Sequence, residues 1–391
     1  MERDLSALDH ALAERDVDGY LLHADSADPD QYYLSGFDAP DPFVTLYDGE
    51  VHLLFNRSLE IGRARREARA ATVESTTEYG YGKLAETHGP EAATIRSIAR
   101  FLEAYDVGSV AVPPRFPLST GDGIREQGIT VTADEASTIE SVRAIKTAEE
   151  IEHVRTAQAA NQAAMATAES LLREAGVATD GTLHHEEDPL TSERVKEAIE
   201  ITLLRRGCGL DGTIVACGPD AADPHDRGSG PLQANEPIIV DIFPRDKTTK
   251  YHGDLTRTFC VGDPDPTLRE WYDLTEAAYR AALAAIEPGV SADTVHAAAC
   301  EIYEDAGLPT LRSDESTETG FIHSTGHGVG LAVHEQPRVA TGGPELEPGH
   351  VITIEPGLYD PAVGGVRIED LVVVTEDGYE NLTDYPVELE P

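Results

Sequence analysis

The feature that most constrains this chain is a set of acidic residues within runs that otherwise have the composition of β-strands. Four apolar runs in the second part of the sequence each contain or begin with one acid: Asp241 in PIIVDIF, Asp254 in DLTRTFCV, Glu355 in VITIEPGLY and Glu369 in GVRIEDLVVVT. Acids are poorly suited to strand interiors and are almost never fully buried unless they are paired. One such acid is compatible with a structural salt bridge, but four in neighbouring runs call for a common explanation.

A shared metal site would explain the four acids. Four carboxylates in one place repel one another by several kcal/mol per pair, even at an effective dielectric constant of about 20. Two divalent cations would cancel that charge, and an oxygen-rich donor set with a single imidazole suits Mn²⁺, Co²⁺ or Fe²⁺. Such cations, about 3.5–4 Å apart, can share a water molecule, lower its pKa and polarise a carbonyl or phosphoryl oxygen. The residues alone favour a di-metal hydrolase, with structural acid–arginine pairs as the alternative.

The strand parity of the acids agrees with a shared site. Side chains two residues apart in a strand point to the same face. Thr353 and Glu355 have this spacing, as do Arg367 and Glu369. We therefore expect each pair to face one side of its strand.

A histidine-rich segment, HSTGHGVGLAVHEQP at residues 323–337, could supply the imidazole. His323 and His327 have the i, i+4 spacing of one helix face. The glycines among them disfavour a helix, because each costs roughly 1 kcal/mol relative to alanine. We expect a loop that brings the backbone close to another group. The spacing alone leaves open whether the histidines are metal ligands, acid–base catalysts or parts of a turn.

Two other groups of potential ligands are weaker. TLHHEEDP at 182–189 contains His184, His185, Glu186 and Glu187, but we favour a solvated acidic loop there over a metal site. The four cysteines are widely spaced and include no CxxC pair. This spacing argues against a zinc ribbon or a disulfide framework and favours buried, reduced thiols.

The charge of the chain is its most unusual bulk property. The sequence has 72 acidic and 30 basic residues, for a formal net charge of -42. Such a chain repels itself strongly at ordinary ionic strength, whereas in molar salt the Debye length falls to about 3 Å. We interpret the acidity as adaptation to a high-salt cytoplasm. The sequence offers no basic patch, so nucleic acid is excluded as a partner.

Hydrophobic segments long enough for a membrane are not expected. No stretch approaches the roughly 18 apolar residues of a membrane span. The N-terminal sequence MERDLSALDHALAERD is charged and amphipathic, without the apolar region of a signal peptide. We therefore expect no membrane partner and a cytoplasmic location.

The pattern of strands and helices divides the 391 residues into two domains, 1–140 and 141–391. The first alternates apolar strands with helical patterns, which is typical of a layered α/β domain. Its expected strands are 19–24, 43–56 with an Asp48-Gly49 turn, and 107–113, and its expected helices include 58–70 and 90–105.

The second domain differs from the first in its pattern, which combines long helices with strongly apolar β runs. Thr147-Ala-Glu-Glu150 is a capping box that opens a long helix ending at Gly176. Helices are expected at about 147–175, 191–206, 267–286 and 291–306.

Taken in order, these residues resemble the pita-bread (M24-type) metallopeptidases, closest to Xaa-Pro dipeptidase (prolidase) and aminopeptidase P. HSTGHGVGLAVHE is similar to the proline-peptidase signature, and the acids and the histidine occur in the family's order. The flanking DLTRTF, TIEPGLY and GGVRIEDLVVV also fit. The resemblance implies an N-terminal creatinase-like α/β domain, without a sharp motif of its own, followed by a pita-bread α+β catalytic domain with a curved antiparallel sheet.

The resemblance also implies a role for each site residue. The implied metal ligands are Asp241, Asp254, His327, Glu355 and Glu369, with Asp254 and Glu369 bridging two cations. Glu355 would also transfer a proton.

Four further residues would act on the substrate. His225 in DPHDR would contact the scissile amide, and His334 would stabilise the tetrahedral intermediate. His323 and Arg367 would contact the carboxylate end of the substrate. Two alternatives remain open: His323 could brace the loop, and Arg367 could clamp a ligand carboxylate.

The implied activity is hydrolysis of Xaa-Pro (imido) bonds through a metal-bridging hydroxide, as a dipeptidase or an aminopeptidase. It would use two divalent cations per subunit, Mn²⁺ or Co²⁺, on a small peptide with proline at its second position, in a homodimer. The metal-binding residues do not distinguish a dipeptidase from an aminopeptidase. That difference depends on how the far end of the substrate pocket is closed. Tyr32, Tyr33 and the SGFDAP segment are candidates for that closure.

Two other functions stay open on the same fold. One is non-peptidase chemistry, as in a metal-dependent lyase or an amidinohydrolase-like enzyme, and the other is non-catalytic binding. The chain also departs from the family pattern after the first ligand, where Asp241-Ile-Phe-Pro replaces the usual Asp-Phe/Tyr-Gly. The interval to Asp254 is slightly longer, so Lys247, Lys250 or His252 could alter substrate choice.

Overall fold

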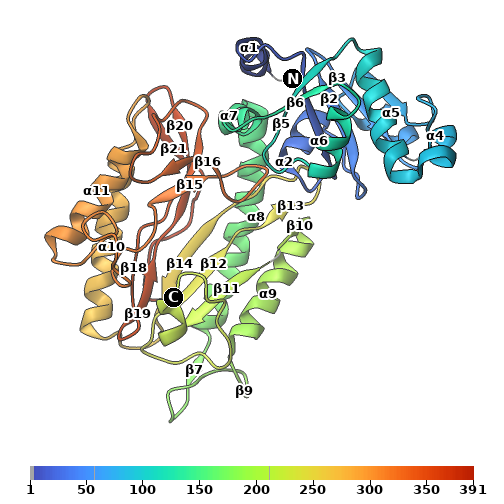
Figure 1. The fold of residues 1–391 in the computed structure, drawn as a ribbon. Coiled ribbons are helices and arrows are strands. Elements are labelled where there is room, and N and C mark those ends of the chain that lie inside the picture. The colour runs from blue at the N-terminus through green and yellow to red at the C-terminus, as the bar shows by residue number, and fades with distance from the viewer. Residues whose placement is uncertain (1–3, 57, 211) are drawn as a thin grey trace. The chain divides into compact units, whose positions relative to one another are not determined.

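Short apolar strands in the first part of the chain assemble into one mixed sheet. The computed structural model describes residues 4–56, 58–210 and 212–391, which fall into two units, 1–143 and 144–391. The strand order in the first unit is β4-β3-β2-β1-β5-β6. Figure 1 labels four of these strands, β2, β3, β5 and β6. These strands are β1 (Gly19–Ala24), β2 (Phe43–Tyr47), β3 (Val51–Phe55), β4 (Thr72–Ser75), β5 (Ser109–Val112) and β6 (Thr130–Ala133).

The helices of the first unit cover this sheet. The longest is α5, whose apolar side chains, including Ile98, Phe101 and Leu102, pack against β1, β2 and β5. The helices are α1 (Ser6–Glu14), α2 (Pro29–Ser35), α3 (Ile61–Glu67), α4 (Tyr81–His88), α5 (Pro90–Ala104), α6 (Leu118–Arg125) and α7 (Thr138–Ala144), which ends at the boundary of the unit. The expected layered α/β arrangement is confirmed.

The second unit opens with a 26-residue helix, α8 (Ala148–Arg173). The backbone N–H of Glu150 donates to Thr147 Oγ1 at 3.3 Å, and the Thr147 N–H donates to Glu150 Oε2 at 2.9 Å. The predicted capping box is therefore formed. The other predicted helices are also present, as α9 (Ser192–Arg205), α10 (Pro266–Ala284) and α11 (Ala292–Asp305).

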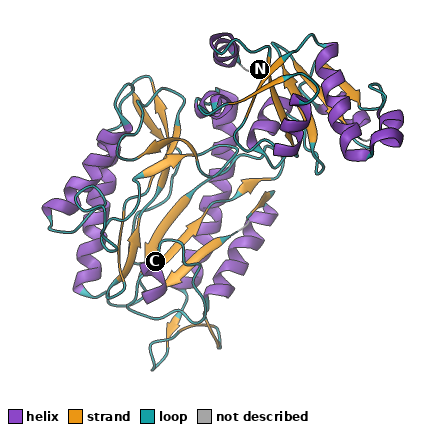
Figure 2. Cartoon of the chain, viewed as in Figure 1, coloured by secondary structure: helices purple, strands orange, loops and turns teal. Residues whose placement is uncertain are grey.

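Two antiparallel sheets, each with its own helix pair, form the body of this unit (Figure 2). The three-stranded sheet β11-β12-β14 packs on α8 and α9, through a core that includes Met165, Ile199 and Val240. The five-stranded sheet β16-β15-β17-β20-β21 packs on α10 and α11, through Tyr279, Cys300 and Val372 among others.

The strands of the second unit are short. Those of the two main sheets are β11 (Thr213–Cys217), β12 (Ile238–Ile242), β14 (Leu255–Phe259), β15 (Gly326–Gly328), β16 (Glu335–Val339), β17 (Val351–Ile354), β20 (Asp370–Thr375) and β21 (Gly378–Asn381). Smaller pairings involve β7 (Gly176–Val177), β8 (Leu183–His185), β9 (Asp188–Pro189), β10 (Cys208–Gly209), β13 (Arg245–Asp246), β18 (Gly357–Asp360) and β19 (Gly364–Arg367), and a 3₁₀ helix, η1, spans Gly218–Ala222.

The two main sheets meet at a seam between β14 and residues 367–369. Thr258 Oγ1 donates to the Arg367 carbonyl and accepts from the Arg367 N–H, both at 2.9 Å. The Glu369 N–H donates to the Thr256 carbonyl at 3.1 Å. The seam is thus hydrogen-bonded where two of the unusual acids lie.

Two of the predicted β runs are each divided at their acid. The run 351–359 is interrupted at Glu355-Pro356, and the run 365–375 is interrupted at Ile368-Glu369. Proline cannot donate to a strand ladder, which accounts for the first break. The acids therefore lie at bends between strands rather than in strand interiors, and only Asp241 lies within a strand.

Within the described residues, no helix combines the length and apolar character needed to cross a membrane. The four cysteines, Cys208, Cys217, Cys260 and Cys300, form no disulfide, in line with the expectation of reduced thiols.

Candidate metal centre

The five predicted ligands converge on the seam from both sheets. The three-stranded sheet contributes Asp241 from β12 and Asp254 from the residue before β14. The five-stranded sheet contributes His327 from β15, Glu355 after β17 and Glu369 before β20. Asp241, Asp254 and Glu369 are buried, with exposures of 8%, 4% and 2%. The site is thus assembled only where the two sheets meet.

Three of the five already have the spacing of a metal site. Among the residues that the structure describes, Asp254, His327 and Glu369 are the group whose ligand atoms all lie within 4.8 Å of one another. Glu355 joins them through His327, because its Oε1 lies 3.2 Å from His327 Nε2. Asp241 is connected differently, through an arginine.

Glycines let His327 enter the site. A Cβ atom at Gly326 would lie 1.9 Å from the Thr353 carbonyl oxygen, and one at Gly328 would lie 2.1 Å from the Gln336 carbonyl oxygen. Only glycine permits such close packing of β15 against its neighbours. The sequence predicted a loop with close backbone approach; the approach is confirmed, but the segment around His327 is a short strand.

The His327 ring is oriented by its own backbone. Its Nδ1 lies 3.1 Å from the Gly328 carbonyl, which can only accept, so Nδ1 carries a proton in both the neutral and the charged ring. Nε2 is left facing Glu355 and, at 3.8 Å, Asp254 Oδ2. This arrangement of the second nitrogen is the usual way in which a protein fixes the tautomer of a metal-binding histidine.

A chain of buried polar groups holds Asp241. Arg367 Nη2 donates to Asp241 Oδ2 at 2.6 Å, and Arg367 Nη1 donates to Tyr359 Oη at 2.8 Å. Tyr359 Oη lies 3.0 Å from His323 Nε2, while His323 Nδ1 lies 2.8 Å from the Ser324 carbonyl. Because Nδ1 must donate to that carbonyl, Nε2 of neutral His323 accepts from Tyr359. Arg367 is 3% exposed, so its contacts are internal.

The predicted face parity is confirmed by these contacts. Thr353 Oγ1 donates to Glu355 Oε1 at 3.2 Å. Thr256 Oγ1 donates to Glu369 Oε2 at 2.6 Å and lies 3.2 Å from Arg367 Nε, so Arg367 and Glu369 face the same group.

The electrostatics of the site reflect crowded negative charge. Burial raises the pKa of Asp254 well above its usual range, and the charges of Glu369, Asp241 and Glu355 add to the effect. Burial, with the charges of Glu355 and Asp241, likewise raises the pKa of Glu369. These carboxylates therefore oppose one another's ionisation, which is the situation that a bound cation relieves.

The pair of Glu355 and His327 behaves differently. Burial works to raise the pKa of Glu355, but the hydrogen bond and the charge of His327 outweigh it and lower this pKa to about 2. Burial works to lower the pKa of His327, and the hydrogen bond and charge of Glu355 raise it overall. Glu355 is thus the most readily ionised acid of the cluster.

The donor set fits divalent cations. It consists of four carboxylates and one imidazole, an oxygen-rich combination suited to Mn²⁺ and related ions. In addition, Asp241 Oδ1 is buried without a hydrogen-bond partner, although Oδ2 of the same carboxylate is bonded to Arg367. A buried carboxylate oxygen in this position is a ready ligand atom.

The two remaining predicted histidines lie at the edge of the site and are exposed. The ring of His334 packs edge-on against His327, with 4.2 Å between centroids. Burial lowers the pKa of His334, and the charges of His327 and His225 contribute. His225, on the exposed loop after η1, also contributes to the lowered pKa of His323, which burial brings to about 4. Both histidines are therefore electrostatically coupled to the centre.

A buried ion pair lies beside His334. Lys146 Nζ is 2.6 Å from Glu335 Oε1, and the two side chains are 1% and 2% exposed. The pair joins the start of the second unit to β16, next to the residue predicted to stabilise the intermediate.

The long interval between Asp241 and Asp254 forms a hairpin. β13 pairs with β10, and Asp246 Oδ1 accepts from the N–H groups of Thr248 and Thr249 at 2.9 and 2.7 Å. The Lys247 N–H donates to the Gly207 carbonyl, so this turn is anchored on β10. The His252 N–H donates to the Gly330 carbonyl at 2.9 Å, which connects the hairpin to the histidine segment.

The segment 182–189 is a hairpin rather than the predicted loop. β8 pairs with β7 and β9, and Glu186 adopts a positive φ of 61° at the turn. His185 Nε2 lies 3.4 Å from Glu174 Oε2 at the surface.

Sequence reasoning missed several residues that position the ligands. Thr256 and Tyr359 contact Glu369 and Arg367 directly, and the buried amide of Gln158 holds the backbone of Asp254. The parity of DLTRTF would have placed Thr256 on the face of the site. Gln158 gave no signal, because its partner is 96 residues away.

Comparison with known proteins places this geometry in a family. Residues 152–376, more than half of the chain, match the description metallopeptidase family M24. The chain belongs to metallopeptidase family M24. Residues 5–145 match the creatinase/prolidase N-terminal domain, so this M24 protein has the expected order of an N-terminal creatinase-like domain and a pita-bread catalytic domain.

Relatives of this M24 protein include named dipeptidases. A "probable dipeptidase PepE" of Mycobacterium tuberculosis is 43% identical over 178 residues, which cover 45% of each chain. A protein named Xaa-Pro dipeptidase from Pyrococcus furiosus is 36% identical over 256 residues, 64% of this chain and 66% of that one. The matched segment thus spans less than half the length of the mycobacterial relative.

Solved structures share the whole fold. The prolidase from Pyrococcus horikoshii OT3 superposes with a TM-score of 0.79 at 25% identity, covering 98% of this chain and 99% of the other. The fold expected from the resemblance is therefore confirmed over both domains.

Proposed function

We propose that this M24 protein is a metallopeptidase that hydrolyses Xaa-Pro peptide bonds in small peptides. The observation that carries the proposal is the buried cluster of Asp254, His327 and Glu369, with Glu355 bonded to His327 and Asp241 beside them. Relatives that bear the names Xaa-Pro dipeptidase and prolidase support the choice of substrate.

The proposed ligands are Asp241, Asp254, His327, Glu355 and Glu369, holding two divalent cations, Mn²⁺ or Co²⁺. When bound, such cations supply an activated water molecule and positive charge opposite the substrate carbonyl oxygen. The burial of the carboxylates and their mutual opposition to ionisation support this assignment.

The chain's own residues would then handle the proton and the oxyanion. Glu355, whose Oε1 lies 3.2 Å from His327 Nε2 beside the buried acids, would take a proton from the attacking water and pass it to the proline nitrogen. His334, exposed and in contact with His327, would donate a hydrogen bond to the developing oxyanion. His225, on an exposed loop, would contact the scissile amide.

The contacts of Arg367 favour a positioning role over the predicted substrate contact. Its guanidinium is 3% exposed and donates to Asp241, Tyr359 and Thr256. We assign it to holding the Asp241 carboxylate. His323, whose two nitrogens bond to Tyr359 and to Ser324, is assigned to bracing this chain.

A substrate comparison tests the proposal. Purified protein would be assayed with Mn²⁺ in molar KCl on Gly-Pro, Leu-Pro and a longer Xaa-Pro peptide, with Leu-Ala as the control dipeptide. Preferential cleavage of the proline peptides is expected, and the ratio of dipeptide to longer peptide distinguishes a dipeptidase from an aminopeptidase.

Metal removal tests the dependence on cations. A chelator should abolish hydrolysis, and added Mn²⁺ should restore it. Hydrolysis that persists in a metal-free sample would overturn the metal-dependent reading, and the complete absence of hydrolysis in the Mn²⁺-loaded sample would leave a binding protein on the same fold.

The organisation of the whole protein is part of the proposal. We assign residues 1–140 to the N-terminal domain and 141–391 to the catalytic domain, in a homodimer located in a high-salt cytoplasm. The net charge of -42 supports the salt assignment. Light scattering in molar KCl would give the mass of the assembly, and a mass near 42.1 kDa would contradict the dimer.

A further inference from the structure

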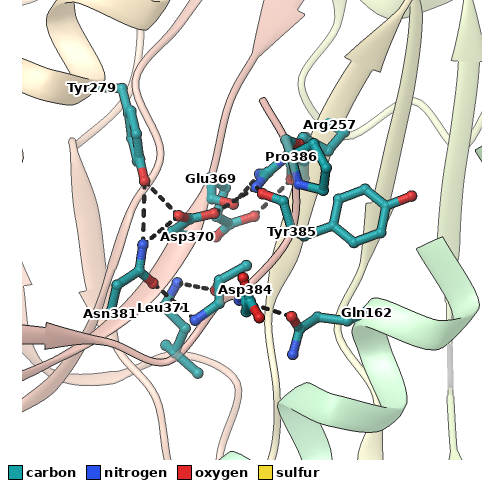
Figure 3. Close-up of polar contacts among 12 residues, drawn as sticks. Gln162, Arg257, Tyr279, Glu369, Asp370, Leu371, Asn381, Asp384, Tyr385 and Pro386 are labelled. Carbon is teal, nitrogen blue, oxygen red and sulfur yellow. Dashed lines mark hydrogen bonds and ion pairs between the residues drawn. The ribbon is translucent and has the colours of Figure 1, made fainter. Parts of the chain in front are cut away.

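Arg257 is the most completely buried large polar side chain near the seam, with 0% exposure. It lies in β14 between Thr256 and Thr258, the two residues whose hydroxyls bond across the seam, and its own side chain occupies the opposite face. Figure 3 shows its guanidinium between Glu369 and Asp370 on one side and Tyr385 and Pro386 on the other.

All five N–H donors of Arg257 have an acceptor. Nε donates to the Pro386 carbonyl at 2.6 Å, and Nη1 donates to the carbonyls of Thr256 at 2.9 Å and Glu369 at 2.7 Å. Nη2 donates to Asp370 Oδ1 and to the Tyr385 carbonyl, both at 2.8 Å. A guanidinium offers five donors in a rigid plane, whereas lysine offers three on a flexible stem. Only arginine can satisfy this set.

The acceptors belong to three separate segments. Thr256 lies in the three-stranded sheet. Asp370 begins β20 of the five-stranded sheet and Glu369 directly precedes it, while Tyr385 and Pro386 lie in the segment after β21. Arg257 therefore fastens both ligand-bearing sheets to one another and to residues 385–386. One of its acceptors is the backbone carbonyl of a proposed ligand, Glu369.

Asp370, the carboxylate partner of Arg257, is itself held by other side chains. Asp370 Oδ2 accepts from the Tyr279 hydroxyl and, at 2.6 Å, from Asn381 Nδ2. Both Asp370 oxygens are therefore occupied, and the carboxylate that balances the Arg257 charge cannot rotate freely. Such a fully satisfied buried network specifies one geometry.

A second buried side chain holds Asp254, another acid of the cluster. The Gln158 amide, fully buried, accepts from the Asp254 N–H at 2.9 Å and donates to the Asp254 carbonyl at 2.8 Å. Gln158 Nε2 also lies 2.8 Å from Thr383 Oγ1, in the segment that Arg257 holds. The segment 383–386 thus connects the supports of Asp254 and Glu369.

We propose that Arg257 is a positioning residue for the metal centre: it sets the separation of the two sheets, and so of the ligands Asp254 and Glu369. The inference rests on the proposed function only in assuming that these acids bind cations. It concerns how the site is held rather than which bond is cleaved.

The test compares Arg257→Lys with a matched substitution outside the seam. Arg143→Lys is the control, because Arg143 is also a buried arginine, bonded to the buried Asp30 at 2.9 Å in the first unit. Mn²⁺ affinity would be measured by titration calorimetry, coordination by the visible spectrum of the Co²⁺-loaded protein, and folding by circular dichroism.

Arg257→Lys should weaken Mn²⁺ binding by about 10–100-fold, the range for outer partners of metal ligands, and should change the Co²⁺ spectrum. Its kcat should fall with little change in KM, because proline-peptide binding does not use Arg257. Arg143→Lys should lower the melting temperature but leave the Mn²⁺ affinity and the Co²⁺ spectrum as in the wild type.

Mn²⁺ affinity and a Co²⁺ spectrum equal to the wild type in folded Arg257→Lys would overturn the proposal. If that variant does not fold, Tyr279→Phe would be used instead, because it removes one hydrogen bond to Asp370. Its Mn²⁺ affinity and Co²⁺ spectrum would then test the proposal. Failure of the wild type to cleave any Xaa-Pro peptide would contradict the proposed function instead, while the metal measurements would still test Arg257.

Discussion

The two nitrogens of His327 have separate tasks, and neighbouring residues set both. Nδ1 is held by the Gly328 carbonyl, so Nε2 is presented to Glu355 and Asp254. The same logic fixes His323, whose Nδ1 is held by Ser324 and whose Nε2 accepts from Tyr359. At the scale of single residues, hydrogen bonds to neighbouring groups therefore fix the orientation of both histidine rings.

Glu355 carries the sharpest prediction at this scale. Glu355→Gln keeps the size and one oxygen ligand but removes the group that takes up a proton, so kcat should fall by about 10²–10⁴-fold. Activity and metal content would be measured on the same sample. Turnover near the wild-type value at full metal occupancy would show that Glu355 does not transfer the proton.

Gly326 gives a stability prediction with its own control. Gly326→Ala would force a Cβ to within 1.9 Å of the Thr353 carbonyl and should destabilise the fold by at least about 1–3 kcal/mol. Gly82→Ala, in helix α4 with nothing within 4 Å, should instead stabilise it by about 0.5–1 kcal/mol. Chemical denaturation would measure both, and equal effects would contradict the close-packing argument.

The four acids proposed as ligands could be picked out from the sequence because an acid in an apolar strand run is anomalous. Tyr359 could not, because a tyrosine in a strand is ordinary, and Thr256 was indicated only by its parity with Asp254. The role of Arg257 could not be predicted from sequence either. Four of its five hydrogen bonds go to backbone carbonyls, which every residue has whatever its side chain.

At the scale of elements, local signals located the helices well and the strands less well. The capping box at Thr147 and the cap at Ser291 begin α8 and α11 where the sequence places them. The β runs were found, but the bends at Glu355 and Glu369 that divide them were not. Those bends depend on the contact between two sheets, which no local window contains.

The Lys146–Glu335 ion pair holds the start of β16, directly after His334. Lys146→Met removes the ammonium that lies 2.6 Å from the buried Glu335 carboxylate, so it should destabilise the fold by about 3–5 kcal/mol. The double variant Lys146→Met/Glu335→Gln should recover most of that loss. Denaturation of the wild type, both single variants and the double variant would measure the coupling, and simple additivity would contradict it.

At the scale of the whole molecule, charge is the dominant property. A net charge of -42 acts over about 10 Å at 0.1 M salt but over only about 3 Å at 1 M. The fold and the metal centre give no information about salt, and the composition gives none about the metal centre. The two were predicted from independent features of the sequence.

Stability should therefore depend on salt. The melting temperature should rise as KCl is increased from about 0.1 M to 1 M, because screening relieves the repulsion among acidic residues. Sucrose at matched osmolality is the control, since it does not screen charge. A melting temperature that does not respond to KCl would exclude adaptation to high salt.

The division of the ligands between two sheets has a consequence for biosynthesis. A nascent chain that has left the ribosome as far as residue 300 contains Asp241 and Asp254 but lacks His327, Glu355 and Glu369. Domains fold broadly in the order of their synthesis, so the first unit can be complete before any full set of ligands exists. If these residues bind cations as proposed, cation loading would be deferred to the last stage of maturation, after the sheets have closed on each other.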